Sequence, residues 1–227
     1  TGSGKSASIT IDVATVDMAS DDIVVSGINN SSQYTYTGEE IKAQNLSLRC
    51  TSNAVNLVEG TDYELKYENN VNVTNEAKLT ITGKGNYSGE KVITFKILPK
   101  NGSTSDITVV FDETKTAEQL KKVYDGNVLK PTVTVADSKR AENETILINA
   151  VDYDIEYSNA SPVNQGTYSV IVKFKGNYTG QRQLSYVIQR KNIADLEDGT
   201  KTVSVIGLES QYAYTGTVVN PTFTVKD

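Results

Sequence analysis

The residues of this chain that could do chemistry are few. The 227 residues contain no histidine and one cysteine, Cys50, which lies in an alternating stretch and is predicted to be a small buried side chain. Asp152 and Asp154 share one face of an expected strand, but Asp62 and Glu64 hold the corresponding positions of an internal repeat, so the pair follows the fold. The sequence thus lacks the usual pairing of nucleophile and base. We expect no enzyme activity and no catalytic residues.

Two short motifs resemble ligand sites without the context that such sites need. Residues 1–6 end like a phosphate-binding loop, yet residues 9–13 alternate like a strand where that motif requires a helix. The acidic run 195–199 offers oxygen ligands suited to calcium, but its spacing departs from the EF-hand loop. A single cysteine also excludes a cysteine-based metal cluster and an intrachain disulfide. We expect no cofactor and no metal site, and interpret both segments as linkers or polar turns.

The elements that would have to position any site come from an internal repeat of about 90 residues. A period of this length indicates whole domains in a row rather than small solenoid units. The matching blocks keep their order and spacing, which makes chance resemblance improbable. The blocks are Tyr-Thr-Gly or Tyr-Asp-Gly at 36–38, 124–126 and 214–216, Asp-Tyr at 62–63 and 152–153, Gly-Asn-Tyr at 85–87 and 176–178, and a closing apolar strand at 95–97 and 186–188.

The repeat divides the chain into four parts. Residues 1–14 are expected to hold the last strand of a preceding repeat, and residues 15–99 and 100–190 the two complete repeats. Residues 191–227 are expected to form a linker and the opening strands of a third, incomplete repeat. The partial repeats suggest a piece of a longer protein, and completion by strand addition from neighbouring molecules is the alternative.

Composition and pattern predict an all-β fold. Thr, Val, Ile and Tyr dominate the periodic stretches, and alternation of period two is clear at 78–82, 132–135 and 169–174. Clusters of Gly, Asn, Asp and Ser separate these runs, as in tandem antiparallel β-sandwiches of the immunoglobulin type. Units of about 90 residues can bury a core without disulfides. The one helical candidate, 116–122, is interpreted as a single turn between strands.

Charge and hydropathy exclude further classes of partner. The chain carries 22 basic and 28 acidic side chains, a balance that disfavours nucleic acid. No apolar segment approaches the roughly 18 residues that a membrane-spanning helix needs. We expect no nucleic-acid partner and no membrane span in this sequence.

Most of the chain resembles the immunoglobulin-like tandem repeats of surface proteins from Gram-positive and gut bacteria, of the Tyr-Asp-Gly type. Residues 36–97 carry that pattern nearly throughout, including Gly-x-Gly-Asn-Tyr-x-Gly and a closing Phe-x-Ile. Residues 124–188 carry it with Tyr186-Val187-Ile188 at the end and Ala160 in place of an Asn. The resemblance implies an extracellular β-sandwich used in stalks and adhesins. It implies no catalytic residues.

The 13 tyrosines could stack on sugars, but most recur once per repeat. A residue required once per repeat is more simply a core or corner tyrosine, with its ring buried and its hydroxyl bonded to a loop backbone. We predict structural roles for this set, and Tyr168 is the least constrained. The set is Tyr34 with Tyr212; Tyr36, Tyr124 and Tyr214; Tyr63 with Tyr153; Tyr67 with Tyr157; and Tyr87 with Tyr178.

Together these patterns favour a passive extracellular stalk of a bacterial cell-surface protein, whose partners are the neighbouring repeats of its own chain. Short linkers at 98–106 and 189–201 would limit bending. The alternative is an adhesin that binds a host glycan or protein, and the polar insertion 135–145 would carry this role if it were displayed at a tip. A third possibility is a stalk reinforced by isopeptide bonds between Lys and Asn.

Overall fold

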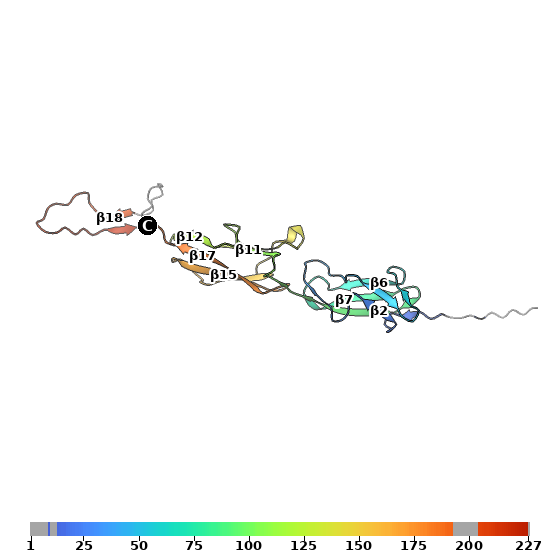
Figure 1. The fold of residues 1–227 in the computed structure, drawn as a ribbon. Helices are drawn as coiled ribbons and strands as arrows, with labels where there is room; N and C mark the ends of the chain where they lie inside the picture. The colour runs from blue at the N-terminus through green and yellow to red at the C-terminus, as the bar shows by residue number, and fades with distance from the viewer. Residues whose placement is uncertain (1–8, 10–12, 193–203, 227) are drawn as a thin grey trace, which may run out of the picture.

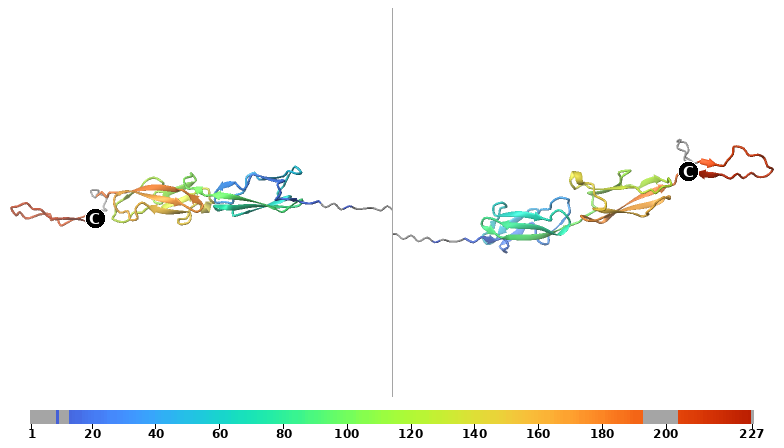
Figure 2. Two further views of the ribbon diagram at one scale, coloured as in Figure 1. Left: turned by 90° about the horizontal axis from the view of Figure 1, so that it is seen from below. Right: turned by 180° about the vertical axis from the view of Figure 1, so that it is seen from behind.

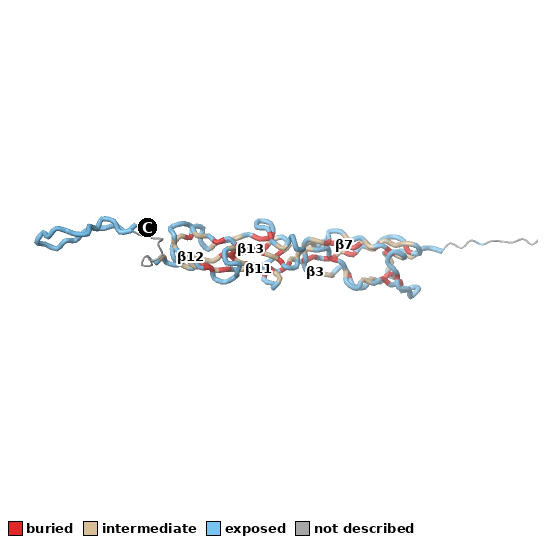
Figure 3. Tube along the Cα trace, turned by 90° about the horizontal axis from the view of Figure 1, so that it is seen from above, coloured by how far each residue is buried: buried red, intermediate tan, exposed pale blue. Residues whose placement is uncertain are grey.

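Two β domains follow one another along a common long axis in the computed structural model, which describes residues 9, 13–192 and 204–226 (Figures 1 and 2). Each domain has two sheets that enclose a core of alternating buried side chains, so the prediction of tandem immunoglobulin-like β-sandwiches is confirmed. The buried positions run through the interior of both domains (Figure 3). Within the described residues the helical structure is one 3-10 turn, η1 (Glu142–Glu144).

The first domain uses its alternating segments as strands. One sheet has the order β2-β4-β5 and the other β3-β9-β7-β6, with β1 paired to β8 at one end. In β7, Ala77, Leu79 and Ile81 are buried while the side chains between them face outward, as its period of two predicts. The strands are β1 (Val16–Asp17), β2 (Ile23–Ser26), β3 (Gln33–Thr35), β4 (Ser47–Cys50), β5 (Val55–Asn56), β6 (Tyr63–Glu68), β7 (Thr74–Gly83), β8 (Tyr87–Ser88) and β9 (Glu90–Leu98).

The second domain repeats this topology with one strand fewer in the smaller sheet. Its sheets are β11-β13 and β12-β17-β15-β14, and β10 pairs with β16 as β1 pairs with β8. The predicted strands at 132–135 and 169–174 lie largely in β13 and β15. The strands are β10 (Lys100–Asn101), β11 (Ile107–Phe111), β12 (Leu120–Val123), β13 (Val133–Asp137), β14 (Tyr153–Tyr157), β15 (Gly166–Phe174), β16 (Tyr178–Thr179) and β17 (Gln181–Gln189).

The larger sheet of each domain is mixed rather than purely antiparallel. β3 runs parallel to β9, and β12 runs parallel to β17, whereas the other pairs in these two sheets are antiparallel. The chain reaches the edge strands β3 and β12 from the smaller sheet of the same domain and not through a hairpin. Parallel neighbours require such a crossover.

Two expectations from the sequence need comment. The single turn predicted between strands at 116–122 is too long, because residues 116–119 form the irregular connection from β11 while Leu120 begins β12, where its side chain is buried. Pairing with β17 decides this, since seven residues cannot sustain a helix against a sheet edge. Of the expected segment 1–14, residues 1–8 and 10–12 lie outside the described residues, so the strand expected there stays a prediction.

A separate hairpin follows the second domain in the sequence. β18 (Ser204–Ile206) and β19 (Thr224–Lys226) pair antiparallel. Residues 204–226 are exposed throughout, including Phe223 and Val225. Their assignment to a third repeat stays a prediction.

Candidate functional site at the domain junction

The chain passes from one domain to the next through a single residue, Pro99. β9 ends at Leu98 and β10 begins at Lys100, which pairs in parallel with Tyr178. The predicted linker 98–106 is therefore too long, because the pairing of β10 with β16 draws its first residues into the second domain. Proline fixes its own φ near −65°, so this connection has few conformations.

An aromatic contact joins the two domains at the junction. The ring of Tyr36 lies edge to face against that of Tyr178, with centroids 5.4 Å apart and an interplanar angle of 80°. Just beyond Tyr36 the chain turns at Gly38, with φ +89°, and a Cβ there would lie 3.2 Å from Cγ of Arg140 in the second domain. The Tyr-Thr-Gly motif of one domain thus faces the polar loop of the next.

Hydrogen bonds of the neighbouring residue, Asn177, also join the two domains. Oδ1 of Asn177 accepts a bond from the amide of Val73 at 2.9 Å, and Nδ2 of Asn177 donates to Oδ1 of Asn72 at 2.9 Å. Asn177 belongs to the repeated Gly-Asn-Tyr motif, whereas its counterpart Asn86 is exposed at the far end of the first domain. The same motif therefore bridges domains where a neighbour is present.

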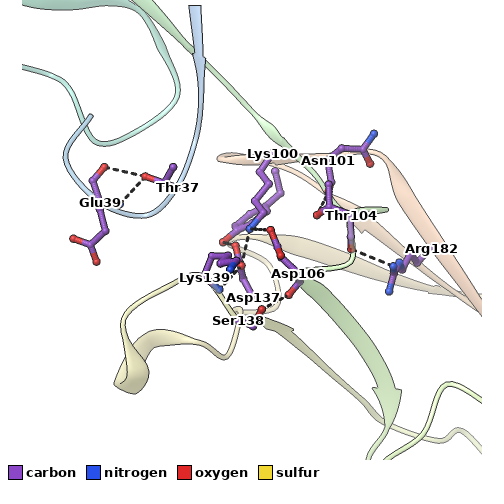
Figure 4. A network of polar contacts seen from close by, with 11 residues as sticks. Thr37, Glu39, Lys100, Asn101, Thr104, Asp106, Asp137, Ser138, Lys139 and Arg182 are labelled. Atoms are coloured by element: carbon purple, nitrogen blue, oxygen red, sulfur yellow. Dashed lines mark hydrogen bonds and ion pairs between the residues drawn. The ribbon is translucent and has the colours of Figure 1, made fainter. Parts of the chain in front are cut away.

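A buried polar network lies in the second domain at the start of β10 (Figure 4). Nζ of Lys100 is 2.7 Å from Oδ1 of Asp137 and 3.3 Å from Oδ2 of Asp106. Asp137 also accepts bonds from the hydroxyl of Tyr178 and from the amide of Lys139. Lys100 is 5% exposed and Asp137 is fully buried. Burial of the phenol, followed by the charge of Asp137, raises the pKa of Tyr178 far above its ordinary value, so the hydroxyl remains a donor.

A pocket of about 610 Å³ opens beside this network and draws its lining from both domains. Thr35 and Thr37 come from the first domain, and Asn101, Asp106 and Lys139 come from the second. Two cations, Lys100 and Lys139, and one anion, Asp106, among hydroxyl and amide groups could hold a small polar ligand by hydrogen bonds. No cluster of three or more His, Cys, Asp or Glu side chains suited to a metal occurs among the described residues.

The repeated tyrosines serve the fold in the two complete domains. Tyr36, Tyr63, Tyr87, Tyr153 and Tyr178 are buried, which confirms their predicted structural role. Corner bonds also appear as expected. In the first domain the hydroxyl of Tyr67 accepts a bond from the amide of Ala43, and in the second that of Tyr157 donates to the carbonyl of Pro131. In the third copy of the motif, Tyr212 and Tyr214 are exposed.

The other residues singled out by the sequence carry no chemistry here. Cys50 is buried, as predicted, and its thiol lies 3.2 Å from the hydroxyl of Ser52. Asp154 and Glu64 pair with Lys175 and Lys84 at the surface, as repeat-equivalent ion pairs. The motifs at 1–6 and 195–199 lie outside the described residues.

The polar insertion 135–145 is not a free tip. It starts in β13 with the buried residues Val135 and Asp137, continues through η1, and presents Arg140 to Gly38 of the first domain. The guanidinium of Arg140 contacts Glu144 at 3.1 Å, while its Nε is buried without a partner. The insertion is thus part of the junction. Comparison of the two repeats within the sequence identifies this stretch as the least repeated one, but the sequence does not indicate which part of the first domain it contacts.

The fold and the junction define a class of tandem β-sandwich protein. No model of a known protein family matches the chain, and a comparison with curated proteins gives no match. Among solved structures, the chain is similar to extracellular cadherin domains 1–4 of protocadherin gamma B7, at 11% identity and a TM-score of 0.23. That similarity covers 90% of this chain and 59% of the protocadherin chain. Among the described residues, no helix is long and apolar enough to cross a membrane.

Proposed function

We propose that this chain is a non-catalytic spacer from the extracellular stalk of a bacterial cell-surface protein, where its domains hold a distal domain away from the surface. The observation that carries this proposal is the junction: one proline separates β9 from β10, and an aromatic contact and side-chain hydrogen bonds join the two domains beside it. A spacer needs a joint that resists bending. The resemblance of the sequence to bacterial surface repeats supports the location.

The residues that recur also support a mechanical role. The repeated tyrosines, glycines and strand positions build turns, corners and cores, and many of the exposed positions differ between the two domains. A protein that binds the same ligand on every repeat would instead repeat an exposed set of aromatic and polar side chains.

Small-angle X-ray scattering on the full chain tests the proposal. We expect the profile of two domains held end to end, unchanged between low and high salt because the junction contacts are mainly aromatic and uncharged hydrogen bonds. A variant with four Gly-Ser residues inserted after Leu98 is the matched control and should give a broader distribution of sizes. If the two proteins scatter alike, the joint is flexible and the spacer proposal fails.

The second candidate is an adhesin, favoured by the pocket at the junction. Its hydroxyl, amide and charged groups are of the kind that hold sugars or polar peptides. A glycan and extracellular-matrix binding screen with the full chain tests it. Saturable binding that is lost in Thr37→Ala or Lys139→Ala would establish the adhesin function. No binding by folded, monomeric protein would favour the spacer function.

A further inference from the structure

The two complete domains differ in chemistry at one place in their shared core. Lys100 in β10 pairs with Tyr178 as Val16 in β1 pairs with Tyr87. Asp137 ends β13 opposite Ile107, as Cys50 ends β4 opposite Ile23. A lysine and an aspartate of the second domain therefore replace a valine and a cysteine of the first.

This replacement is not required by the fold. Cys50 is fully buried and Val16 is half-buried in the first domain, so an apolar pair fills the same space without charge. Each ion taken out of water costs several kcal/mol, and an apolar pair of similar volume is often as stable as a buried ion pair. Among the described residues, Lys100 is the one lysine in the buried class.

The groups around this pair are arranged as in a site for amide formation. Nζ of Lys100 is 2.7 Å from Oδ1 of Asp137, and the second carboxylate, that of Asp106, is 3.3 Å from Nζ. The amide of Lys139 donates to Oδ1 of Asp137 at 3.0 Å, and the hydroxyl of Tyr178 donates to Oδ2 at 3.1 Å. One donor thus points at Oδ1, on which charge would develop if the nitrogen attacked Cγ, and the other points at Oδ2, the oxygen that would leave.

We propose that Lys100 and Asp137 condense within the folded domain to an isopeptide bond that ties β10 to β13. Asp106 takes a proton from the ammonium and passes it to Oδ2 of Asp137, and the neutral amine then attacks Cγ of the neutral carboxyl group to form the C–N bond. The negative charge on Oδ1 is held by the amide of Lys139. The bond from Cγ to Oδ2 then breaks, and Oδ2 leaves as water with two of the three ammonium protons. The third proton stays on the new amide.

The surroundings favour this step over the resting ion pair. Burial strengthens the donors from Lys139 and Tyr178 by excluding water, and contact within the fold replaces a bimolecular encounter. The product also removes two charges from a site that is nearly closed to solvent. Because Lys100 follows Pro99 directly, the bond would lie where tension along the chain enters the second domain.

The third copy of the repeat carries the same residue types. Pro-Thr-Val-Thr-Val-Ala-Asp at 131–137 recurs as Pro-Thr-Phe-Thr-Val-Lys-Asp at 221–227, and Lys191 follows Ile188 as Lys100 follows Ile97. Asp227 lies outside the described residues. The proposal for Lys100 and Asp137 does not depend on this second pair, and it stands apart from the spacer function because a bond can form whether or not the domains are held rigidly.

Intact-mass spectrometry of the denatured full chain tests the proposal. We expect a mass about 18 Da below that calculated from the sequence, because formation of the amide releases one water. Denaturation separates an ion pair but leaves an amide intact, so the deficit reports the covalent bond. A tryptic map should contain one branched peptide joining Lys100 to Asp137. The map is needed because the Asp125–Gly126 sequence can also lose water as a succinimide, which would not join two peptides.

Three variants complete the test. Lys100→Met should restore the full mass, and Lys121→Met, at an exposed position of β12, should keep the deficit. Asp106→Asn should remain folded by circular dichroism and form the bond slowly or not at all. Folded wild-type protein at its full sequence mass, or a branched peptide that persists in Lys100→Met, would overturn the proposal.

Discussion

Tyr36 and Tyr178 meet across the domain junction at a centroid distance of 5.4 Å, whereas Tyr124, which holds the position of Tyr36 in the second repeat, is only half-buried. The same motif therefore has a different environment in each copy. The neighbouring domain, and not the motif, decides whether the ring is covered.

Removing the ring of Tyr36 should loosen the joint without unfolding either domain. The aromatic pair contributes about 0.5–1.5 kcal/mol beyond the area it buries, so Tyr36→Ala should broaden the distribution of distances between the domains. Spin labels at Val58→Cys and Val128→Cys, both exposed, would measure it while Cys50 stays buried and unlabelled. Tyr36→Phe keeps the ring and is the matched control. An unchanged distribution in Tyr36→Ala would assign the stiffness to Pro99 alone.

Asn177→Ala should expose the amide of Val73 to solvent exchange. That amide donates to Oδ1 of Asn177, and its loss removes a hydrogen bond worth about 1 kcal/mol. Hydrogen exchange followed by NMR should show faster exchange at Val73 and little change in the core of β7. The control is Asn86→Ala, whose exposed side chain holds the same place in the first repeat. Equal protection in both variants would show that the bond does not form in solution.

Lys100→Ala should destabilise the second domain strongly. It leaves the carboxylate of Asp137 buried with only the amide of Lys139 and the hydroxyl of Tyr178 as partners, and an uncompensated buried charge of this kind costs about 3–5 kcal/mol. The double substitution Lys100→Val with Asp137→Cys copies the first repeat and should be milder. Denaturant unfolding measures both. A double variant as unstable as the single one would show that the second domain depends on its polar pair.

Acid should remove the contribution that the ionised Asp112 makes to the stability of the second domain. Hydrogen bonds from the hydroxyl of Thr134, and then from Thr132, lower the pKa of this carboxyl below its ordinary value. A lowered pKa in the folded state stabilises the domain above the unfolded-state pKa of about 3.9, and the stabilisation is lost as pH falls through the folded-state value. Asp112→Asn should therefore cost stability at neutral pH and match the wild type in strong acid. The measurement is the free energy of unfolding of both proteins as a function of pH. A difference between the two that stays constant at all pH values would contradict this assignment.

The sequence by itself determined the local and repeating features of the protein. Alternation of period two in β7 and β15 fixed which side chains face the core, since successive residues of a strand point to opposite faces. Repetition also identified Tyr67 and Tyr157 as equivalent corner residues, and both hydroxyls bond to backbone at matching positions. The turn predicted at 116–122 is too long because pairing with β17 draws residues 120–122 into β12 against a weak local preference.

Only the tertiary structure decided how the repeats meet and what the junction contains. Tyr36 and Tyr178 are far apart in the chain, and no period relates Lys100 to Asp137 and Asp106. The contacts of Asn177 require a neighbouring domain at the right distance, which β10 sets by pairing directly after Pro99. Such contacts depend on the relative placement of whole sheets, which the alternation within one strand does not encode.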